Sequence, residues 1–525
     1  MEIFSNILIY FVIVPLLTLA GLAVCSNKGI KAIRTVAVTG ATALMALAIA
    51  LICIFLQARG AGDTSEMILQ SRVTWYAPLN IELALGVDGV SVVMLVLSAF
   101  IVFAGVFASW KMDPMPRQYF MWFFLLSTGV FGFFISVDLF TMFMFYEVAL
   151  IPMYLLIGVW GSGNKNYSAM KLTLMLMGGS AFLMLGLIGI YFHSAPEGQA
   201  LTMNILDIAR NNAIPHNWQY FLFPLTFVGF GVLGAMFPFH TWSPDGHASA
   251  PTAVSMLHAG VLMKLGGYGC FRIAICLMPF AANQLAWIFL TLTGISIVYG
   301  AFSACVQTDL KYINAYSSVS HCGMVLFAIL MFNNTAMTGA VLQMLSHGLM
   351  TALFFALIGM IYGQTHTRDI RDMGGFMHAI PYLGVCYVIA GLASLGLPGL
   401  SGFAAEMTIF VGSFIHNDVF HRVLTILATT SIVITAVYIL RVVAKLLFGT
   451  FEYHKHGHDG EAPVVITDIK ASGLRDATWE ERLSTITLIA GMTAIGCFPN
   501  FFVDIISSSF NTVVAALQAV LPAAM

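Results

Sequence analysis

Three ionisable residues lie inside long apolar stretches of the chain: Glu147, Lys264 and Glu406. Glu147 is the single acid of LFTMFMFYEVALIPMYLLIGVW, residues 139–160. A charged side chain in hydrocarbon costs at least about 2.5 kcal/mol, so each of these groups must face protein or water. A lysine and a carboxylate held at that depth can exchange a proton when their surroundings change. Three such charges in separate spans predict a proton path, and a permanent salt bridge between helices is the structural alternative.

Histidines in further apolar stretches could extend this path. His321 lies in AYSSVSHCGM, His347 in LQMLSHGLM, and His258 precedes Lys264 by six residues. An imidazole ring binds a proton at either nitrogen near neutral pH and can therefore relay it. A spacing of six puts His258 and Lys264 roughly 120° apart on a regular helix, so they share a face only if the helix is distorted. A hydrogen-bonded core histidine is the structural alternative at each position.

The composition is that of a polytopic membrane protein. The chain has 525 residues, of which 59% are hydrophobic and 9% are charged, and its mean hydropathy is +0.90. Soluble domains average about a quarter charged residues. The net charge of −2 and the absence of a basic run in the sequence exclude nucleic acid as a partner.

The cysteines and the histidine-rich loop predict no cofactor and no metal on this chain. Eight cysteines occur, and none forms a CxxC pair that could hold zinc or an iron–sulfur cluster. His454, His456 and His458 alternate in EYHKHGHDG. This pattern predicts a solvated loop, and adventitious metal binding is its alternative.

Spans of about 20 apolar residues predict fourteen transmembrane helices and an all-α fold. The N-terminus lacks a basic leader and a small-residue cleavage site, so it predicts a first span and not a removed signal. The expected spans are 3–25, 34–58, 89–110, 118–136, 139–160, 170–193, 218–239, 251–276, 284–306, 312–332, 336–362, 379–415 with a break, 423–448 and 484–506.

The lysines and arginines predict the orientation of these spans. Sixteen fall on one side of the fourteen-span arrangement, and four, Arg59, Arg72, Arg210 and Arg422, fall on the other. Because cytoplasmic loops carry the excess of positive charge, we expect both termini on the outer side of the membrane.

Two of the expected spans contain a helix breaker. Pro238 interrupts the seventh in GAMFPFHTWSPDGH, and Pro398 interrupts the twelfth in SLGLPGLSGF. Paired interruptions of this kind indicate an inverted repeat. If spans four to eight recur as nine to thirteen, the odd number of helices turns the second copy upside down. The predicted parts are helices one to three (1–110), a first repeat (111–278), a second repeat (279–448), and an inside loop with span fourteen and a tail (449–525).

Long stretches of the sequence resemble the antiporter-like membrane subunits of respiratory complex I. The resemblance covers most of residues 80 to 450. Its motifs are LALGVDGVSVVML (83–95), FTMFMFYEVALIPMYLLIGVWG (140–161), FPFHTWSPDGHASAPTAVSMLHAGVLMKLGGYG (237–269), QTDLKYINAYSSVSHCGMVL (307–326), MLSHGL around His347, and HTRDIRDMGG through LGLPGLSGFAAEMTIFVGSF to Phe414.

This resemblance implies a proton-translocating subunit of NADH-quinone oxidoreductase in the bacterial cytoplasmic (inner) membrane. It assigns the family's proton-path residues to Glu147, Lys264, His321, His347 and Glu406. Glutamate at position 406 favours the M type of subunit. The L-type and N-type subunits and the Mrp antiporter subunits look similar to one another in having a lysine at this position. The implied partners are L-type and N-type subunits and lipids, and flavin, iron–sulfur clusters and quinone are expected on partner subunits.

One position departs from the family pattern. The family usually has a lysine five residues before the first break, as the partner of the Glu147 carboxylate, and this chain has Leu233 there. We expect His258 to take that role, on the condition that its side chain lies within about two water lengths of Glu147. The alternatives are a subunit of an Mrp-type cation/proton antiporter or of a membrane-bound hydrogenase, and an inert structural spacer, for which Leu233 is the best argument.

Overall fold

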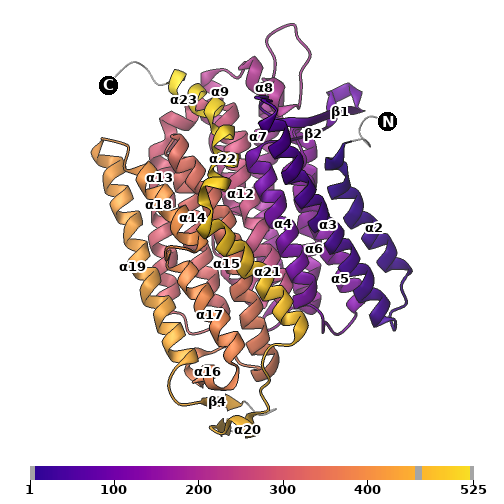
Figure 1. Ribbon diagram of the computed structural model, residues 1–525. Coiled ribbons are helices and arrows are strands. Elements are labelled where there is room, and N and C mark those ends of the chain that lie inside the picture. Colours follow the sequence, from indigo (N-terminus) through magenta and orange to yellow (C-terminus); the bar gives the residue numbers. More distant parts are fainter. Residues whose placement is uncertain (1–5, 456–463, 521–525) are drawn as a thin grey trace.

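The computed structural model describes residues 6–455 and 464–520. Long helices run side by side through most of the molecule (Figure 1). The N-terminal helices are η1 (Ile7–Ile9), α2 (Tyr10–Val24), α3 (Ile30–Gly60), α4 (Gly89–Ala108), α5 (Pro116–Ile135), α6 (Leu139–Trp160) and α7 (Lys165–Phe192). They are followed by α8 (Ile205–Asn211), α9 (His216–Leu233), α10 (Trp242–Ser249), α11 (Thr252–Leu257), η3 (His258–Leu262), α12 (Met263–Gly269) and η4 (Cys270–Ile275).

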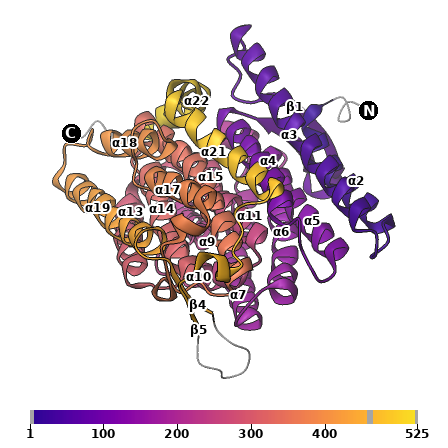
Figure 2. The same ribbon diagram turned by 60° about the horizontal axis from the view of Figure 1, so that its bottom comes forward.

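The remaining helices complete the bundle. They are α13 (Pro279–Val306), α14 (Leu310–Ile329), α15 (Asn334–Thr365), η5 (Ile370–Asp372), α16 (Phe376–Ala379), α17 (Pro381–Ser394), α18 (Ser401–Ser413), α19 (Val419–Leu447), α20 (Ile469–Ser472), α21 (Trp479–Cys497), α22 (Pro499–Ser507), η6 (Ser508–Phe510) and α23 (Asn511–Val520). Figure 2 shows α2 and α3 at one edge of the bundle and α19 at the opposite edge.

Aspartates begin several of these helices. Asp88, Asp138, Asp309 and Asp418 are the N-caps of α4, α6, α14 and α19, and each side chain accepts a hydrogen bond from a backbone N–H of the first turn. A carboxylate at this position satisfies donors that have no partner within the helix. The caps therefore fix where the spans begin at both faces of the bundle.

Two small sheets lie at opposite ends of the bundle, which the all-α expectation did not include. Strands β1 (Ile68–Tyr76) and β2 (Ile81–Val87) form an antiparallel hairpin around η2 (Ala77–Leu79). At the other end, β3 (Met373–Gly374), β4 (Glu452–Lys455) and β5 (Val464–Ile466) form a three-stranded sheet. Both sheets occupy polar connections between spans, where water can satisfy the unpaired edges.

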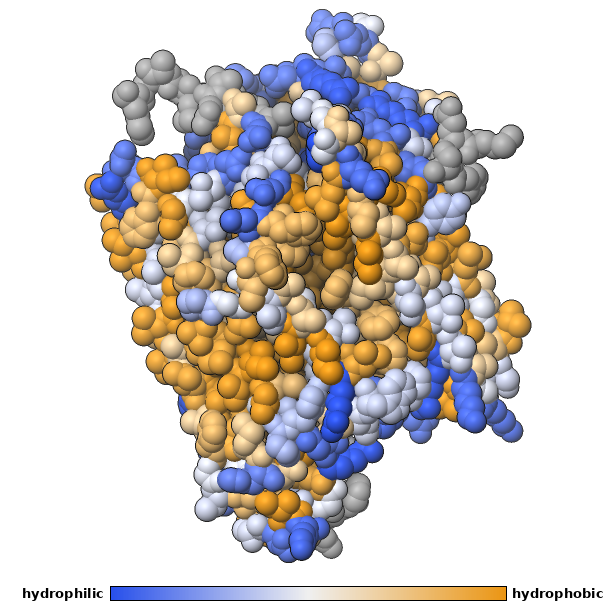
Figure 3. All heavy atoms as spheres, viewed as in Figure 1, coloured by the Kyte–Doolittle hydropathy of each residue, from blue (hydrophilic) through white to orange (hydrophobic). Residues whose placement is uncertain are grey.

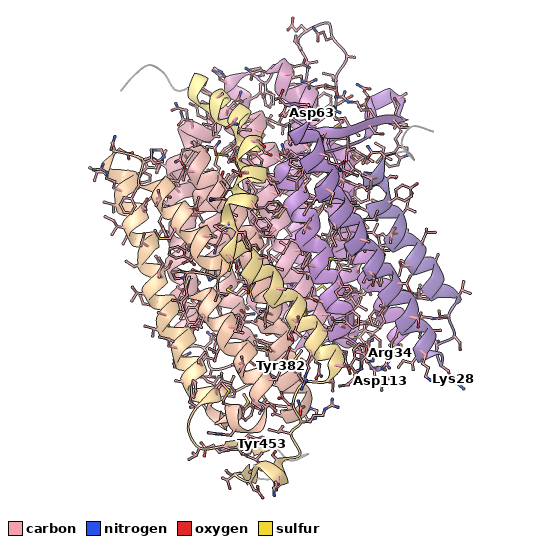
Figure 4. The ribbon with its side chains drawn as sticks, viewed as in Figure 1. Lys28, Arg34, Asp63, Asp113, Tyr382 and Tyr453 are labelled. Carbon is pink, nitrogen blue, oxygen red and sulfur yellow. The ribbon has the colours of Figure 1, made fainter. Side chains whose placement is uncertain are left out.

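Hydropathy divides the surface into an apolar band between two polar ends. Figure 3 shows hydrophobic residues around the middle of the molecule and hydrophilic residues at the top and bottom. In Figure 4, Lys28, Arg34 and Asp113 lie at the lower end with Tyr382 and Tyr453, and Asp63 lies at the upper end. The chain is therefore a multi-pass membrane protein.

Nine of the described helices are long and apolar enough to cross a membrane, or ten if α21 with α22 and η6 counts as one span. The other spans predicted from the sequence fall on α9, on α14, on the run from α11 to η4, and on the pair α17 and α18. These are shorter, more polar or broken helices. The last predicted span, 484–506, is bent by 79° between Cys497 and Pro499, because proline starts a helix readily but cannot continue one.

Both predicted interruptions fall between helices. Pro238 lies in the turns that separate α9 from α10, where Ala235 has a φ of 51°. Pro398 lies between α17 and α18, where Gly396 and Gly399 adopt φ values of 64° and 91°. Gly396 and Gly399 suit this left-handed backbone, because glycine has no Cβ.

Candidate proton pathway

Lys264 lies at the centre of the candidate site, on α12 directly after a π turn. Its ammonium donates a hydrogen bond to the carbonyl of Ala259 and lies 2.7 Å from Nδ1 of His347 on α15. The π turn of η3 distorts the helix between His258 and Lys264. An ammonium only donates, so Nδ1 of His347 accepts and the ring proton resides on Nε2.

His321 on α14 continues the path beyond His347. The centroids of the two rings are 5.2 Å apart. Nδ1 of His321 lies 2.9 Å from Nε2 of Gln343 and 3.9 Å from a carboxylate oxygen of Glu406. The amide nitrogen of Gln343 donates, so it holds the His321 tautomer whose proton is on Nε2. Three helices, α14, α15 and α18, thus bring these side chains together.

The second helix break makes room for Glu406. This residue lies on α18, which starts just after the break at Pro398. A Cβ at Gly396 would lie 2.8 Å from a carboxylate oxygen of Glu406. Glycine at this turn therefore serves two purposes, because it adopts the left-handed backbone and leaves space for the acid.

His258 and His247 form the other end of the buried path. Their ring centroids are 4.2 Å apart, and His258 also stacks on Trp242 at 5.2 Å. Neither nitrogen of either ring has a hydrogen-bond partner among the described residues. Buried polar atoms in this state are the usual positions of ordered water. His258 is the first residue of η3, and Lys264 follows directly after this π turn.

A partly exposed polar cluster lies near His247 at the lower end of the bundle. Asp245 on α10 accepts a hydrogen bond from Lys171 at 2.6 Å and one from the Tyr312 hydroxyl at 2.9 Å. Lys311 and Arg368 bind the carbonyls of Ala250 and Ala248, which flank the end of α10. The side chains of Asp245 and Lys171 are 23% and 24% exposed, so water reaches this cluster.

The path itself is buried. His247, His258, Lys264, His321, His347 and Glu406 are each at most 7% exposed. A cavity of about 10 Å³ next to Lys264 is bounded by Gly234, Gly267 and Cys322 among others. This volume is close to the minimum that one water molecule needs. The structure therefore holds a series of buried polar side chains between α10 and α18, with a small cavity beside Lys264.

Glu147 does not join this run. Its side chain is half-buried on α6, one carboxylate oxygen has no partner among the described residues, and the carboxylate lies beside the Ser180 hydroxyl of α7. The structure shows no hydrogen bond or ion pair between Glu147 and His258, whose described ring contacts are with Trp242 and His247. The proposed pairing of Glu147 with His258 thus stays a prediction. Leu233 is buried at the end of α9 and supplies no charge.

Three parts of the site escaped the sequence analysis: His247, Gln343 and the Asp245 cluster. His247 lies in the polar segment after the first break, and only the charges and histidines within apolar stretches were singled out. Gln343 carries no charge. His247 could have been predicted from the sequence, because two histidines, His240 and His247, follow Pro238 closely.

Comparison with known proteins identifies the fold. The family described as "NADH:quinone oxidoreductase/Mrp antiporter, TM" matches residues 136–435. The chain is 34% identical to NADH-quinone oxidoreductase subunit M of Rickettsia prowazekii, over 83% of this chain and 84% of that protein. It is 36% identical to NAD(P)H-quinone oxidoreductase chain 4-2 of Synechocystis, over 73% of this chain and 68% of that protein.

Two solved structures share the arrangement of helices. A chain of respiratory complex I from Thermus thermophilus superposes with a TM-score of 0.82 at 22% identity, over 98% of this chain and 99% of that one. A chain of the Mrp complex from Dietzia also gives a TM-score of 0.82, at 18% identity and 99% coverage of both chains. The chain therefore belongs to the NADH:quinone oxidoreductase/Mrp antiporter membrane-subunit family. Within it, the similar curated proteins are subunit M and chain 4 of the respiratory oxidoreductase.

Proposed function

We propose that this chain is the antiporter-like, proton-translocating subunit of a bacterial NADH-quinone oxidoreductase. The likeness to subunit M over four fifths of both chains supports this function over that of an Mrp subunit. We further propose fourteen spans, with two inverted five-helix repeats that each contain one broken helix, and both termini on the outer side. The two breaks, at Pro238 and Pro398, and the sixteen-to-four distribution of basic residues support this arrangement.

The observation that carries the proposal is the buried polar run across the bundle. Protons enter from the inside near the Asp245 cluster and reach His247 and His258. They load Lys264, pass His347 and His321, and leave near Glu406. Each step is either a direct contact, such as the 2.7 Å between Lys264 and His347, or a gap that water can bridge.

The driving free energy comes from outside the chain. Electron transfer from NADH to quinone uses flavin and iron–sulfur clusters on partner subunits, and L-type and N-type subunits flank this one in the inner membrane. A change in a neighbour alters the field at Glu147, which is the half-buried member of the predicted set. The altered field shifts the proton affinity of Lys264, and through it that of Glu406.

The test is proton pumping by the assembled complex in proteoliposomes, normalised to NADH oxidation. We expect Glu406→Gln and Glu147→Gln each to lower the number of protons moved per NADH. Glu197→Gln, at an exposed loop position, is the matched control and should pump normally. Full pumping by Glu406→Gln would refute the path, because the amide keeps the shape of the side chain and removes its proton.

An Mrp-type antiporter is the second candidate, because the Mrp structure superposes equally well. Neighbouring genes for flavin and iron–sulfur subunits separate the two, since an antiporter needs neither. The inert-spacer alternative predicts that pumping is unchanged in every variant of the path.

A further inference from the structure

A compact group of potential metal ligands lies away from the proton path, where α18 connects to α19. His416, Asp418 and His421 follow the pattern H-x-D-x-x-H. One ring nitrogen of each histidine and one carboxylate oxygen lie within 4.8 Å of one another. The connection is at the upper end of the bundle, which is also the end of β1 and β2 (Figure 1). All three side chains are half-buried, so solvent ions reach them.

Each histidine already has a hydrogen-bond partner that orients its ring. Nε2 of His416 lies 2.7 Å from the carbonyl of Met331. A carbonyl only accepts, so this nitrogen carries the ring proton and Nδ1 keeps a lone pair. Nδ1 of His421 lies 2.7 and 2.8 Å from the two oxygens of Asp418, so this nitrogen and one of these oxygens can bind the same ion when the proton between them leaves to solvent. The contact of His416 with Met331 is typical, because metal-binding histidines generally have a hydrogen-bond partner on the nitrogen that does not bind the metal.

The backbone of the connection is held in place by other contacts. Asp418 is the N-cap of α19 and accepts a hydrogen bond from the His421 N–H at 3.1 Å. Arg422 binds the His416 carbonyl at 3.2 Å and the Asn417 side chain at 2.8 Å. The two imidazole rings stack with centroids 4.4 Å apart. Little conformational freedom is therefore left for a metal to remove, which favours binding.

We propose that His416, Asp418 and His421 bind a divalent transition metal of the Zn²⁺ class. The ligands are one nitrogen from each imidazole and one carboxylate oxygen, and water completes the coordination. Two imidazoles favour Zn²⁺, Ni²⁺ or Cu²⁺, whereas Mg²⁺ and Ca²⁺ prefer sites made wholly of oxygen. The site stands independently of proton translocation, because none of its ligands belongs to the buried path.

A metal at this site joins three parts of the bundle. Met331 belongs to the turn between α14 and α15, His416 follows α18, and His421 lies in the first turn of α19. Since α18 carries Glu406, the metal fastens the outer end of the helix that holds the last acid of the path. The predicted consequence is a more stable connection between α18 and α19.

The experiment measures Zn²⁺ binding to the full chain, purified in detergent without a histidine tag and first treated with a chelator. Equilibrium dialysis with Zn²⁺ alone should show one site in the wild type, with a Kd that rises about tenfold or more in His416→Gln, His421→Gln and Asp418→Asn. The asparagine keeps the helix cap, so that variant separates loss of the ligand from loss of the fold. His193→Gln, a histidine outside the cluster, is the matched control and should bind as the wild type does.

Two outcomes would overturn the site. One is an unchanged Zn²⁺ stoichiometry and Kd in His421→Gln, and the other is displacement of Zn²⁺ by an equal concentration of Mg²⁺. A visible absorption band from bound Co²⁺ in the wild type, lost in Asp418→Asn at an unchanged thermal midpoint, would support it.

Discussion

Replacing Lys264 by methionine tests whether the ammonium carries protons. The substitution keeps an unbranched chain of similar length and removes the donor that contacts Ala259 and His347. His347 then has no hydrogen-bond partner among the described residues. A cavity of about 10 Å³ lies beside position 264, on the side of Gly234 and Cys322, and its volume is about that of one water molecule. We expect proton pumping to fall at least tenfold, which corresponds to about 1.4 kcal/mol on the transfer barrier.

The fold should survive this change, because two opposing contributions nearly cancel. Two hydrogen bonds from a charged group are lost, at about 1.5–3 kcal/mol each. Removing a charge from the middle of the membrane stabilises the folded chain by about 2.5–3.5 kcal/mol. The net loss is therefore at most a few kcal/mol, and we expect Lys264→Met to assemble into the complex in normal amounts.

The assay is quenching of a pH-sensitive dye in proteoliposomes that contain the assembled complex, with NADH oxidation measured in parallel. Lys264→Arg is the decisive companion, because arginine keeps the positive charge and does not release its proton. We expect both variants to oxidise NADH and to lose pumping. Full pumping by Lys264→Met would refute the path, and full pumping by Lys264→Arg would show that position 264 needs only a fixed charge.

Three further substitutions test the surroundings of the path. Arg272→Met should lower the thermal midpoint of the complex, because it leaves the buried Asp88 carboxylate unpaired at a cost of about 3–5 kcal/mol. Adding Asp88→Asn should restore most of the lost stability, since the amide carries no charge and still caps α4. Gly266→Ala should destabilise the chain by about 1–3 kcal/mol in thermal unfolding, because its Cβ would lie 2.4 Å from a backbone nitrogen of the preceding span. Gln343→Leu should lower pumping roughly twofold to tenfold, as expected for the loss of the one hydrogen bond, worth about 0.5–1.5 kcal/mol, that fixes the His321 tautomer.

Each of these predictions has a contradicting result. An unchanged midpoint in Arg272→Met would show that water or another group satisfies Asp88. Gly363→Ala is the control for the glycine variant, since nothing lies within 4 Å of a Cβ added there, and equal stability of both variants would contradict the close approach. Unchanged pumping by Gln343→Leu would mean that the tautomer of His321 does not matter.

The buried positions of Lys264 and Glu406 could be predicted from the sequence for a physical reason. Hydrocarbon penalises Lys264 and Glu406 so strongly that their presence signals a polar interior, whatever the details of packing. The span around Glu147 is equally clear, and the predicted 139–160 coincides with α6. The family and the membrane class are confirmed by the comparisons.

Local backbone geometry and neutral partners are harder to predict. The π turn at η3 depends on packing between helices, and no residue type marks it. His247 lies outside the apolar stretches, so its stacking on His258 follows only from the way the first break folds α10 back onto the bundle. The bend at Pro499 was missed because hydropathy continues across it while the helix does not.

Leu233 separates two ways in which Glu147 could contribute. A glutamate that is paired within the chain would need a cation on α9 or η3, and among the described residues Glu147 has only the Ser180 hydroxyl beside its carboxylate. A half-buried acid without an internal cation responds strongly to any charge brought near it from outside, because no fixed partner opposes the change. We therefore expect that, without a lysine at position 233, charges outside the chain control Glu147. On this basis, introducing lysine at position 233 should weaken the influence of the neighbours by giving Glu147 a permanent partner.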